Sequence, residues 1–221
     1  MDYVSASYDA VMAERLAGLR IGVLFIGRAD RGLGIDGAVE DAGGGVTRVR
    51  VIGVPVDPEA LHAALEGSEA GAAYADDGDL QALGQALAEE FVAGGETPLW
   101  DELADDLVQE QSGNFDAPLD AVVVARTERP GSTATGRFVA GLFEGVNGNV
   151  PAVGVESTRT VPSAVPAYRR GGLSIVDDVD RRLGKISLAV LLAGGEPGHY
   201  GVKGGHDAAV PPIEPVEPRS G

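Results

Sequence analysis

Short, unbroken runs of apolar and β-branched residues alternate along this chain with segments whose apolar residues recur at helical spacing. The strand-like runs are Ile21–Ile26, Val46–Val54, Leu119–Ala125, Ala152–Val155 and Leu173–Val176. Unbroken apolar runs are typical of strands that helices cover on both faces, as in parallel sheets. Their alternation with helices favours βαβ units. The pattern therefore predicts an α/β fold with a doubly wound, mostly parallel, Rossmann-like sheet.

The predicted helices fill the intervals between these runs. A first helix over Tyr8–Leu19 has Val11, Met12 and Leu16 at helical spacing and leads directly into the first strand. Residues 67–78, rich in Gly, Ala and Asp, are expected to form a loop between two helices. The other helices are expected at Asp36–Ala42, Pro58–Glu66, Leu80–Ala93, Leu99–Gln111, Thr133–Gly145 and Ile186–Ala193.

The size of the chain fits one domain. With 221 residues and 44% hydrophobic content, it can bury a single sizeable core. We expect this α/β domain to cover residues 1–207, including the first helix. The remaining residues, 208–221, include the Pro-rich sequence PPIEPVEPRSG and have no apolar face, so a disordered tail is expected.

Charge and composition exclude several functions. The chain has 34 acidic and 17 basic residues, and the resulting charge of −17 repels phosphate backbones and anionic headgroups. Nucleic acid is therefore not an expected partner. No cysteine is present, which excludes disulfides, thiolate metal sites and thiol catalysis. The longest apolar runs are far shorter than the about 18 residues of a membrane span, so the chain as written is expected to be soluble.

A glycine-rich segment follows the first predicted strand. It contains a G-x-G-x-x-G sequence, with an acidic residue 20 positions further on: Gly32, Gly34, Gly37 and Asp57. This spacing is that of a dinucleotide-binding turn, but residues 28–31 separate the strand from the first glycine, so the turn is longer than pyrophosphate binding requires. A loop with Asp36 capping the next helix is the simpler interpretation. A Rossmann-like enzyme that binds a nucleotide or sugar phosphate is the alternative.

Histidines offer few routes to catalysis or metal binding. His62 occupies an ordinary position within a predicted helix, and no serine lies in a G-x-S-x-G elbow, so we expect no enzyme activity. His199, His206 and Asp207 share a glycine-rich loop and are weak candidates for a divalent metal such as Cu(II) or Zn(II). Copper(I) prefers thiolate and thioether ligands, and the chain has no Cys and two Met.

The same loop is the predicted interaction surface. The glycines of GHYGVKGG allow turns with positive φ, and Tyr200 can anchor the loop by packing its ring. His199, Tyr200 and Lys203, with Arg169 and Arg170, then form a surface for an acidic partner. Pairing of the two arginines with nearby aspartates of this chain is the alternative.

The last third of the chain carries the most specific motifs, which are PSAVPAYRRGGLSIVDDVD, GKISLAVLLAGG and EPGHYGVKGG. These segments resemble the C-terminal half of an actinobacterial copper-transporter family, typified by mycobacterial copper transport protein B. Nearer the N-terminus, LAGLRIGVLFIG and DGAVEDAGGGVTRVRV resemble the start of the globular domain of that family. The resemblance extends from about Leu16 to Lys203.

The resemblance implies a membrane-associated protein of the cell envelope, linked to copper efflux or resistance. Pore formation in an outer membrane is proposed for the mycobacterial member. A related branch is associated with cell separation, beside a membrane partner that resembles thiamine pyrophosphokinase. Full-length relatives begin with a transmembrane helix and a coiled coil, so this chain is expected to be a trimmed protein or a domain-only relative. Copper is the ion that the family implies, but no family ligand motif maps onto residues of this sequence. Association of copies of the chain is left open.

Overall fold

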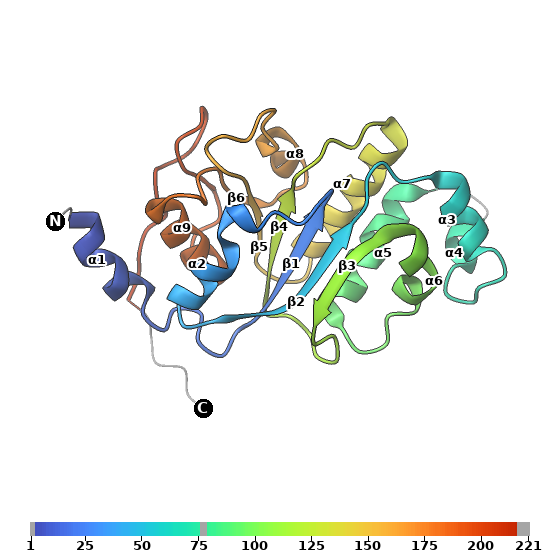
Figure 1. Cartoon of the computed structure of the whole chain (residues 1–221), viewed down its shortest axis with the longest axis horizontal. Coiled ribbons are helices and arrows are strands. Elements are labelled where there is room, and N and C mark those ends of the chain that lie inside the picture. Colours follow the sequence, from blue (N-terminus) through green and yellow to red (C-terminus); the bar gives the residue numbers. More distant parts are fainter. Residues whose placement is uncertain (1–2, 76–78, 216–221) are drawn as a thin grey trace.

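A single mixed sheet organises the molecule (Figure 1). The computed structural model describes residues 3–75 and 79–215. Within them, seven strands lie in the order β3-β2-β1-β4-β5-β6-β7. The strands are β1 (Arg20–Ile26), β2 (Gly45–Ile52), β3 (Val108–Gly113), β4 (Ala121–Arg126), β5 (Ala152–Val155), β6 (Ser174–Val176) and β7 (His199–Tyr200).

All neighbouring strands pair in parallel except β2 and β3, which are antiparallel. Strand β1 has β2 on one side and β4 on the other, so Val23 lies beside both Val49 and Val123. The α/β class and the mostly parallel sheet are therefore confirmed.

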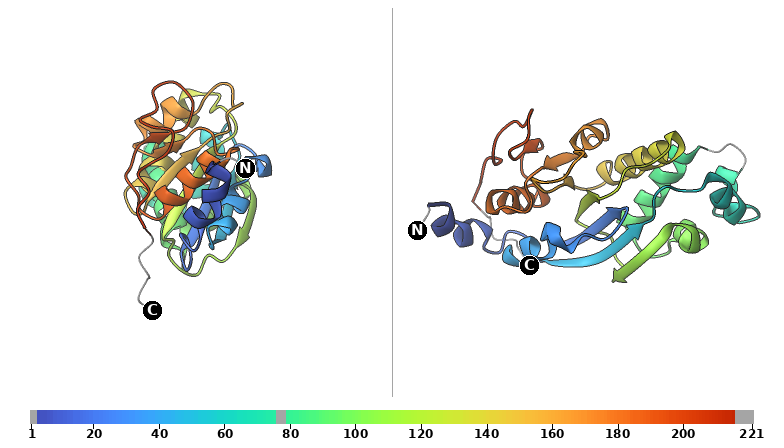
Figure 2. Two further views of the ribbon diagram at one scale, coloured as in Figure 1. Left: turned by 90° about the vertical axis from the view of Figure 1, so that its left-hand side faces the viewer. Right: turned by 45° about the horizontal axis from the view of Figure 1, so that its top comes forward.

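Helices cover both faces of the sheet, and two separate apolar clusters form the core. One face packs against α3 (Pro58–Leu65), α5 (Leu80–Ala93), α6 (Pro98–Leu107), α7 (Thr133–Asn147) and α8 (Val165–Arg170). The other face packs against α1 (Tyr3–Met12), α2 (Ile35–Asp41) and α9 (Arg182–Leu192). Figure 1 shows α2 in front of the strands and α5 and α7 behind them. Helix α1 lies at one end of the molecule against α9 (Figure 2).

The two covered faces explain the unbroken apolar runs. In β4, Val122 and Val124 face the cluster with α5 and α7, whereas Ala121, Val123 and Ala125 face the cluster with α9. Because both sets of side chains are removed from water, neither face requires polar residues. The predicted strands at β1, β2, β4, β5 and β6 are confirmed for this reason.

Helices α5 and α7 approach each other through glycines. A Cβ on Gly84 of α5 would overlap the carbonyl oxygen of Phe138, and a Cβ on Gly141 of α7 would overlap that of Gln81. These helices, together with α2 and α3, lie where the helical spacing predicts them, and α9 overlaps the predicted Ile186–Ala193 but begins earlier, at Arg182.

The predicted helix Leu99–Gln111 is wrong in its second part. Helix α6 ends at Leu107, and the polar segment that follows forms β3, which is exposed at the edge of the sheet. An edge strand with no buried face has no apolar pattern to reveal it. The first predicted helix, Tyr8–Leu19, is also misplaced. Helix α1 begins earlier, at Tyr3, and ends at Met12, and turns with positive φ follow at Glu14 and Gly18.

Three shorter segments also differ from expectation. Helix α8 and strand β7 were not predicted, and α4 (Ala72–Ala75) lies within the expected loop, of which residues 76–78 are outside the described residues.

In the Pro-rich tail, Ala208 pairs with Tyr200, Pro211 is buried, and Arg15 donates a hydrogen bond to the carbonyl of Glu214. Residues 208–215 therefore follow a defined path, and 216–221 lie outside the described residues.

Candidate functional site

Charged side chains are buried where the last strands of the sheet end. Glu156 follows β5, Asp177 and Asp178 follow β6, and His199 lies in β7. All four residues are nearly inaccessible, although Asp and Glu are seldom buried without partners. Because the carboxyl ends of parallel strands share one edge of a sheet, residues from separate segments meet there.

Asp177 is the centre of this cluster. Its carboxylate accepts hydrogen bonds from the backbone N–H groups of Val202 and Lys203, at 2.7 and 3.0 Å. It also lies 2.6 Å from Nε2 of His199. Three donors around a fully buried carboxylate offset its loss of hydration. The glycine-rich loop after β7 is therefore fixed to the end of β6.

The imidazole of His199 links Asp177 to the surface. On its other side, Nδ1 lies 2.8 Å from Nη2 of Arg169, which also hydrogen-bonds the carbonyl of Gly205. A guanidinium can only donate, so Nδ1 accepts and Nε2 carries the proton that it donates to Asp177. Asp207 accepts a hydrogen bond from the backbone N–H of His199 at 2.8 Å. The loop thus closes on itself around His199.

A second buried pair lies beside the first. Glu156 is 1% exposed and forms an ion pair with Lys203, whose backbone N–H is also bonded to Asp177. The carboxylate of Glu156 further accepts a hydrogen bond from the Ser163 hydroxyl at 2.7 Å. Glu156 was not among the predicted site residues. The sequence signal was an acid directly after an apolar strand, in AVGVE.

Asp178 is the least satisfied member of the cluster. Its Oδ1 atom is buried without a hydrogen-bond partner among the described residues. Burial, and next the negative charge of Asp177, raise the pKa of Asp178 to about 6. Asp180 differs: burial opposes its ionisation, but hydrogen bonds from Thr158 outweigh burial, and its pKa is lowered. The pKa values of Asp178 and Asp180 are thus shifted in opposite directions.

A pocket of about 380 Å³ opens next to His199. Arg169, His199 and Asp207 line its polar side, and Leu173, Ile175 and Pro197 line its apolar side. Such a mixture can hold a small polar group or a side chain of a partner. Since both ring nitrogens of His199 already have partners, the imidazole mainly positions Arg169 at this pocket.

The structure places the predicted contact residues in two environments. Arg169 and Arg170 are exposed and Lys203 is half-buried, whereas His199 is 3% and Tyr200 4% exposed. The expectation that His199 and Tyr200 contribute to a surface is therefore corrected, because both belong to β7 and pack inside the fold. Arg169 lies against His199 and not against Asp177 or Asp178. For Arg169, Arg170 and Lys203, a contact role stays a prediction.

The predicted metal candidates do come near one another. The rings of His199 and His206 have centroids 6.4 Å apart, and Asp207 is hydrogen-bonded to the backbone of His199. Within residues 3–75 and 79–215, no group of three or more His, Cys, Asp or Glu side chains is arranged to hold a metal ion. Nδ1 of His206 lies 2.7 Å from the carbonyl of Lys203.

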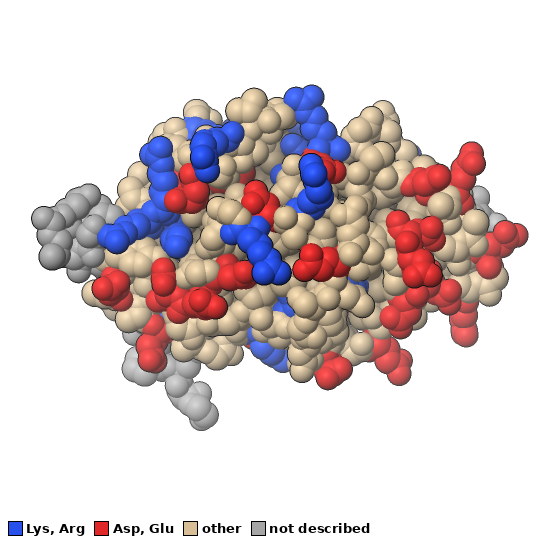
Figure 3. All heavy atoms as spheres, viewed as in Figure 1, with Lys and Arg blue, Asp and Glu red and all other residues tan. Residues whose placement is uncertain are grey.

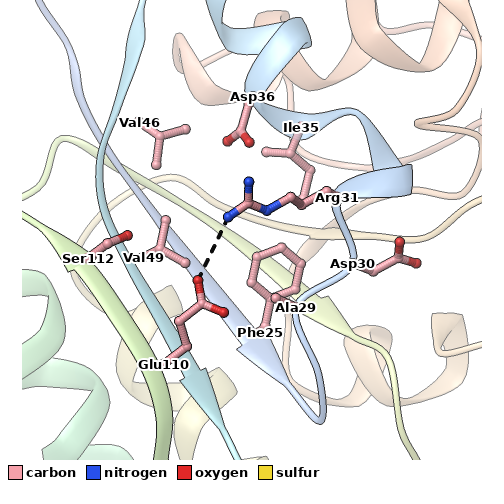
Figure 4. Close-up of a pocket in the computed structure, with 10 residues that line it drawn as sticks. All are labelled: Phe25, Ala29, Asp30, Arg31, Ile35, Asp36, Val46, Val49, Glu110 and Ser112. Carbon is pink, nitrogen blue, oxygen red and sulfur yellow. Dashed lines mark ion pairs between the residues drawn. The ribbon is translucent and has the colours of Figure 1, made fainter.

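The glycine-rich segment after β1 borders a separate pocket of about 230 Å³ (Figure 4). Its floor consists of Phe25, Val46 and Val49, and Arg31 reaches across it towards Glu110 at 4.0 Å. Two more carboxylates, those of Asp30 and Asp36, also line it. Three acids against one guanidinium make the pocket negative overall.

The four glycine-motif residues are not gathered around this pocket. Gly32 lies in the short helix η1 (Arg31–Leu33), Gly34 with φ 69° precedes α2, and Gly37 lies within α2. Asp57 caps α3 by accepting hydrogen bonds from Glu59 and Ala60. None of the four is among the residues that line the pocket. The glycine that makes the turn at the end of β1 is Gly27, with φ 112°, outside the motif.

Charge is segregated along the molecule. Residues 51–125 contain 17 Asp and Glu and no Lys or Arg, so this segment carries a charge equal to the whole formal charge of −17. In Figure 3 the acidic residues crowd the end formed by α3, α4, α5 and α6, whereas basic residues gather over the other half. Exposed arginines outside residues 51–125 include Arg129, Arg159, Arg169, Arg170 and Arg181.

Comparison with known proteins identifies the family. Among the described residues, no helix has the length and hydropathy needed to cross a membrane. No curated protein matches the sequence. A family model described as copper transport outer membrane protein, MctB, matches residues 1–211, which is nearly the whole chain. This chain therefore belongs to the MctB family of copper transport outer membrane proteins.

Proposed function

We propose that this chain is the globular part of a cell-envelope protein that supports copper efflux or resistance, or a related process such as cell separation, through contacts with other proteins. Family membership supports the link to copper transport. In this role the chain is not an enzyme, and its sheet is a doubly wound, Rossmann-like scaffold.

The observation that carries the contact proposal is the position of the exposed arginines. Arg169 and Arg170 protrude from α8 next to a loop that Asp177 and His199 hold in place. A fixed positive surface on a protein of charge −17 is complementary to an acidic partner and repels a basic one. A membrane or envelope protein, such as a thiamine pyrophosphokinase-like neighbour, is the proposed partner.

Copper tolerance of cells provides the test. A strain that lacks the gene is complemented with the wild type, with Arg170→Glu, or with Arg31→Glu, which reverses the charge of another exposed arginine elsewhere. We expect the wild type and Arg31→Glu to restore growth in copper, and Arg170→Glu to fail although it folds with the same Tm. Restoration by Arg170→Glu would remove the contact surface from the proposal. Failure of the wild type would remove the copper role.

A second candidate function is binding of a nucleotide or sugar phosphate at the loop after β1. The observation in its favour is the pocket of about 230 Å³ beside this loop. Its three carboxylates disfavour phosphate and leave a sugar as the better occupant. A thermal-shift screen with NAD, ATP and a nucleotide sugar tests it, because a ligand at 100 times its Kd stabilises the fold by about 2.7 kcal/mol. Unchanged Tm values would reject this function.

A further inference from the structure

Another pocket lies between α7 and α8, on the face of the sheet opposite α9. It has a volume of about 280 Å³. Arg126, the last residue of β4, and Arg170, the last residue of α8, line it together with an apolar wall that includes Val139 and Phe143. Apolar walls with a few fixed polar groups are typical of small-molecule sites.

The two arginines that line this pocket outnumber its acidic residues. Within the described part of the chain, neither Arg126 nor Arg170 forms an ion pair, and the guanidinium groups have no hydrogen-bond partner. Glu144 is the acid among the lining residues, and both of its carboxylate oxygens accept hydrogen bonds from Nε2 of Gln81 at 2.9 Å. The Gln81 amide is neutral, so two positive charges and one negative charge leave the lining positive overall. An acid-rich protein thus has two guanidinium groups without partners beside one cavity.

The buried side chain of Tyr168 fixes the backbone from which both arginines extend. Its hydroxyl accepts a hydrogen bond from the backbone N–H of Arg126 at 2.7 Å and donates one to the carbonyl of Val155 at 3.0 Å. Its ring packs on Phe143, with centroids 5.5 Å apart, and Arg170 follows two residues later in the same helix. The backbone positions of Arg126 and Arg170 are therefore set before a ligand binds, which lowers part of the entropic cost of binding.

We propose that this pocket binds a carboxylate or phosphate group carried on an apolar body. The planar guanidinium groups of Arg126 and Arg170 match the geometry of either anion, and Val139 and Phe143 contact the apolar part. The proposal goes beyond the contact surface and does not depend on the role in copper transport, because it concerns the isolated chain.

Calorimetric titration of the purified protein at low salt tests it with defined probes. 3-Phenylpropionate and phenyl phosphate distinguish the two anions, and 3-phenylpropanamide is the neutral match of the first. We expect at least one anionic probe to bind and the amide to bind at least about tenfold more weakly, as expected for loss of a charge-assisted hydrogen bond.

Variants locate the site. Arg126→Gln with Arg170→Gln should weaken the anionic probe at least about tenfold. Arg129→Gln with Arg159→Gln removes the same charge from exposed residues outside the pocket and should leave binding unchanged. Gly136→Leu should block the probe without altering charge, because a Cβ at Gly136 enters open space. The proposal would be overturned if both pairs of arginine variants lost the same affinity for the anionic probe, or if the amide bound as tightly as that probe. It would also be overturned if Gly136→Leu bound the probe as the wild type does, or if no probe bound at up to about 10 mM.

Discussion

His199 and Asp177 are joined by a hydrogen bond of 2.6 Å between Nε2 and a carboxylate oxygen, and both side chains are almost inaccessible to solvent. The pair lies where β6 and β7 end, and it fixes the loop that follows β7. Removing one member leaves the other buried without its partner, which is more costly than removing an exposed ion pair.

Asp177→Ala should therefore lower the free energy of unfolding by about 3–5 kcal/mol, because Nε2–H of His199 and the backbone N–H groups of Val202 and Lys203 all lose their acceptor, at about 1–3 kcal/mol for each donor left unsatisfied. Urea unfolding at neutral pH measures this change. Asp180→Ala is the matched control, since Asp180 is exposed and its carboxylate accepts hydrogen bonds from the backbone N–H and the hydroxyl of Thr158. A loss at Asp177 no larger than at Asp180 would contradict a stabilising role of the buried pair.

Stability should depend on pH through Asp178. Its pKa is raised to about 6 in the folded protein, chiefly by burial, so the unfolded chain ionises first as pH rises. As the pH rises from about 4 to above 6, the wild type therefore loses stability relative to a variant in which residue 178 cannot ionise. Asp178→Asn should match the wild type near pH 4 and exceed it at pH 8 in urea unfolding.

Asp180→Asn provides the control of opposite sign. The pKa of Asp180 is lowered because hydrogen bonds from Thr158 outweigh burial, so its carboxylate stabilises the fold above the unfolded pKa. Asp180→Asn should therefore be less stable than the wild type at pH 8 and approach it at low pH. If the stability of both variants relative to the wild type changed with pH in the same direction, the assigned pKa shifts of Asp178 and Asp180 would not explain the pH dependence.

Two glycines of α7 should respond in opposite ways to the same substitution. A Cβ at Gly136 meets no atom within 4 Å, so Gly136→Ala should stabilise the helix by about 0.5–1 kcal/mol. A Cβ at Gly141 would overlap the carbonyl of Gln81 in α5, so Gly141→Ala should cost at least about 1–3 kcal/mol. Thermal unfolding of both variants checks the prediction, and similar Tm values would contradict the close approach of α5 and α7.

Arg50 should be replaceable by an apolar residue of similar length. Its guanidinium carbon lies 4.1 Å from the ring centre of Trp100, but Nε and Nη1 are buried without hydrogen-bond partners among the described residues. Burial leaves the charge of Arg50 poorly solvated and lowers its pKa to about 10.

We expect Arg50→Met to stay within about 1 kcal/mol of the wild type, because the thioether chain fills the space and removes the unsatisfied donors. Arg50→Ala leaves a cavity beside Trp100 and should cost about 2–4 kcal/mol. Chemical unfolding of both variants measures the difference. Equal losses would show that the stacked charge itself stabilises the fold.

The sequence predicts those elements whose pattern reflects burial. Strand β4 has a buried residue at each position from Ala121 to Ala125, so its run is visible without a structure. Strand β3 has a polar sequence at the sheet edge, and β7 has two residues, so neither has a periodic signal.

The candidate site is harder to predict for the same reason. Residues 163–170 and 198–207 are identifiable as a motif-rich region, and the arginines are indeed exposed. The burial of His199 is not foreseeable, since it depends on pairing with Asp177, 22 residues earlier, across two short strands. A histidine between glycines has no local feature that separates a loop surface from a strand.

The segregation of charge affects how the molecule is oriented when it approaches a charged surface. Because the net charge belongs to one end and the remainder of the chain is balanced, the protein has a large electric dipole moment along its length. Near an anionic surface, torque on this dipole turns the acidic end away before contact, over distances of about one Debye length, roughly 8 Å at physiological ionic strength. The molecule is thus oriented before it contacts the surface, and a higher salt concentration weakens this orientation.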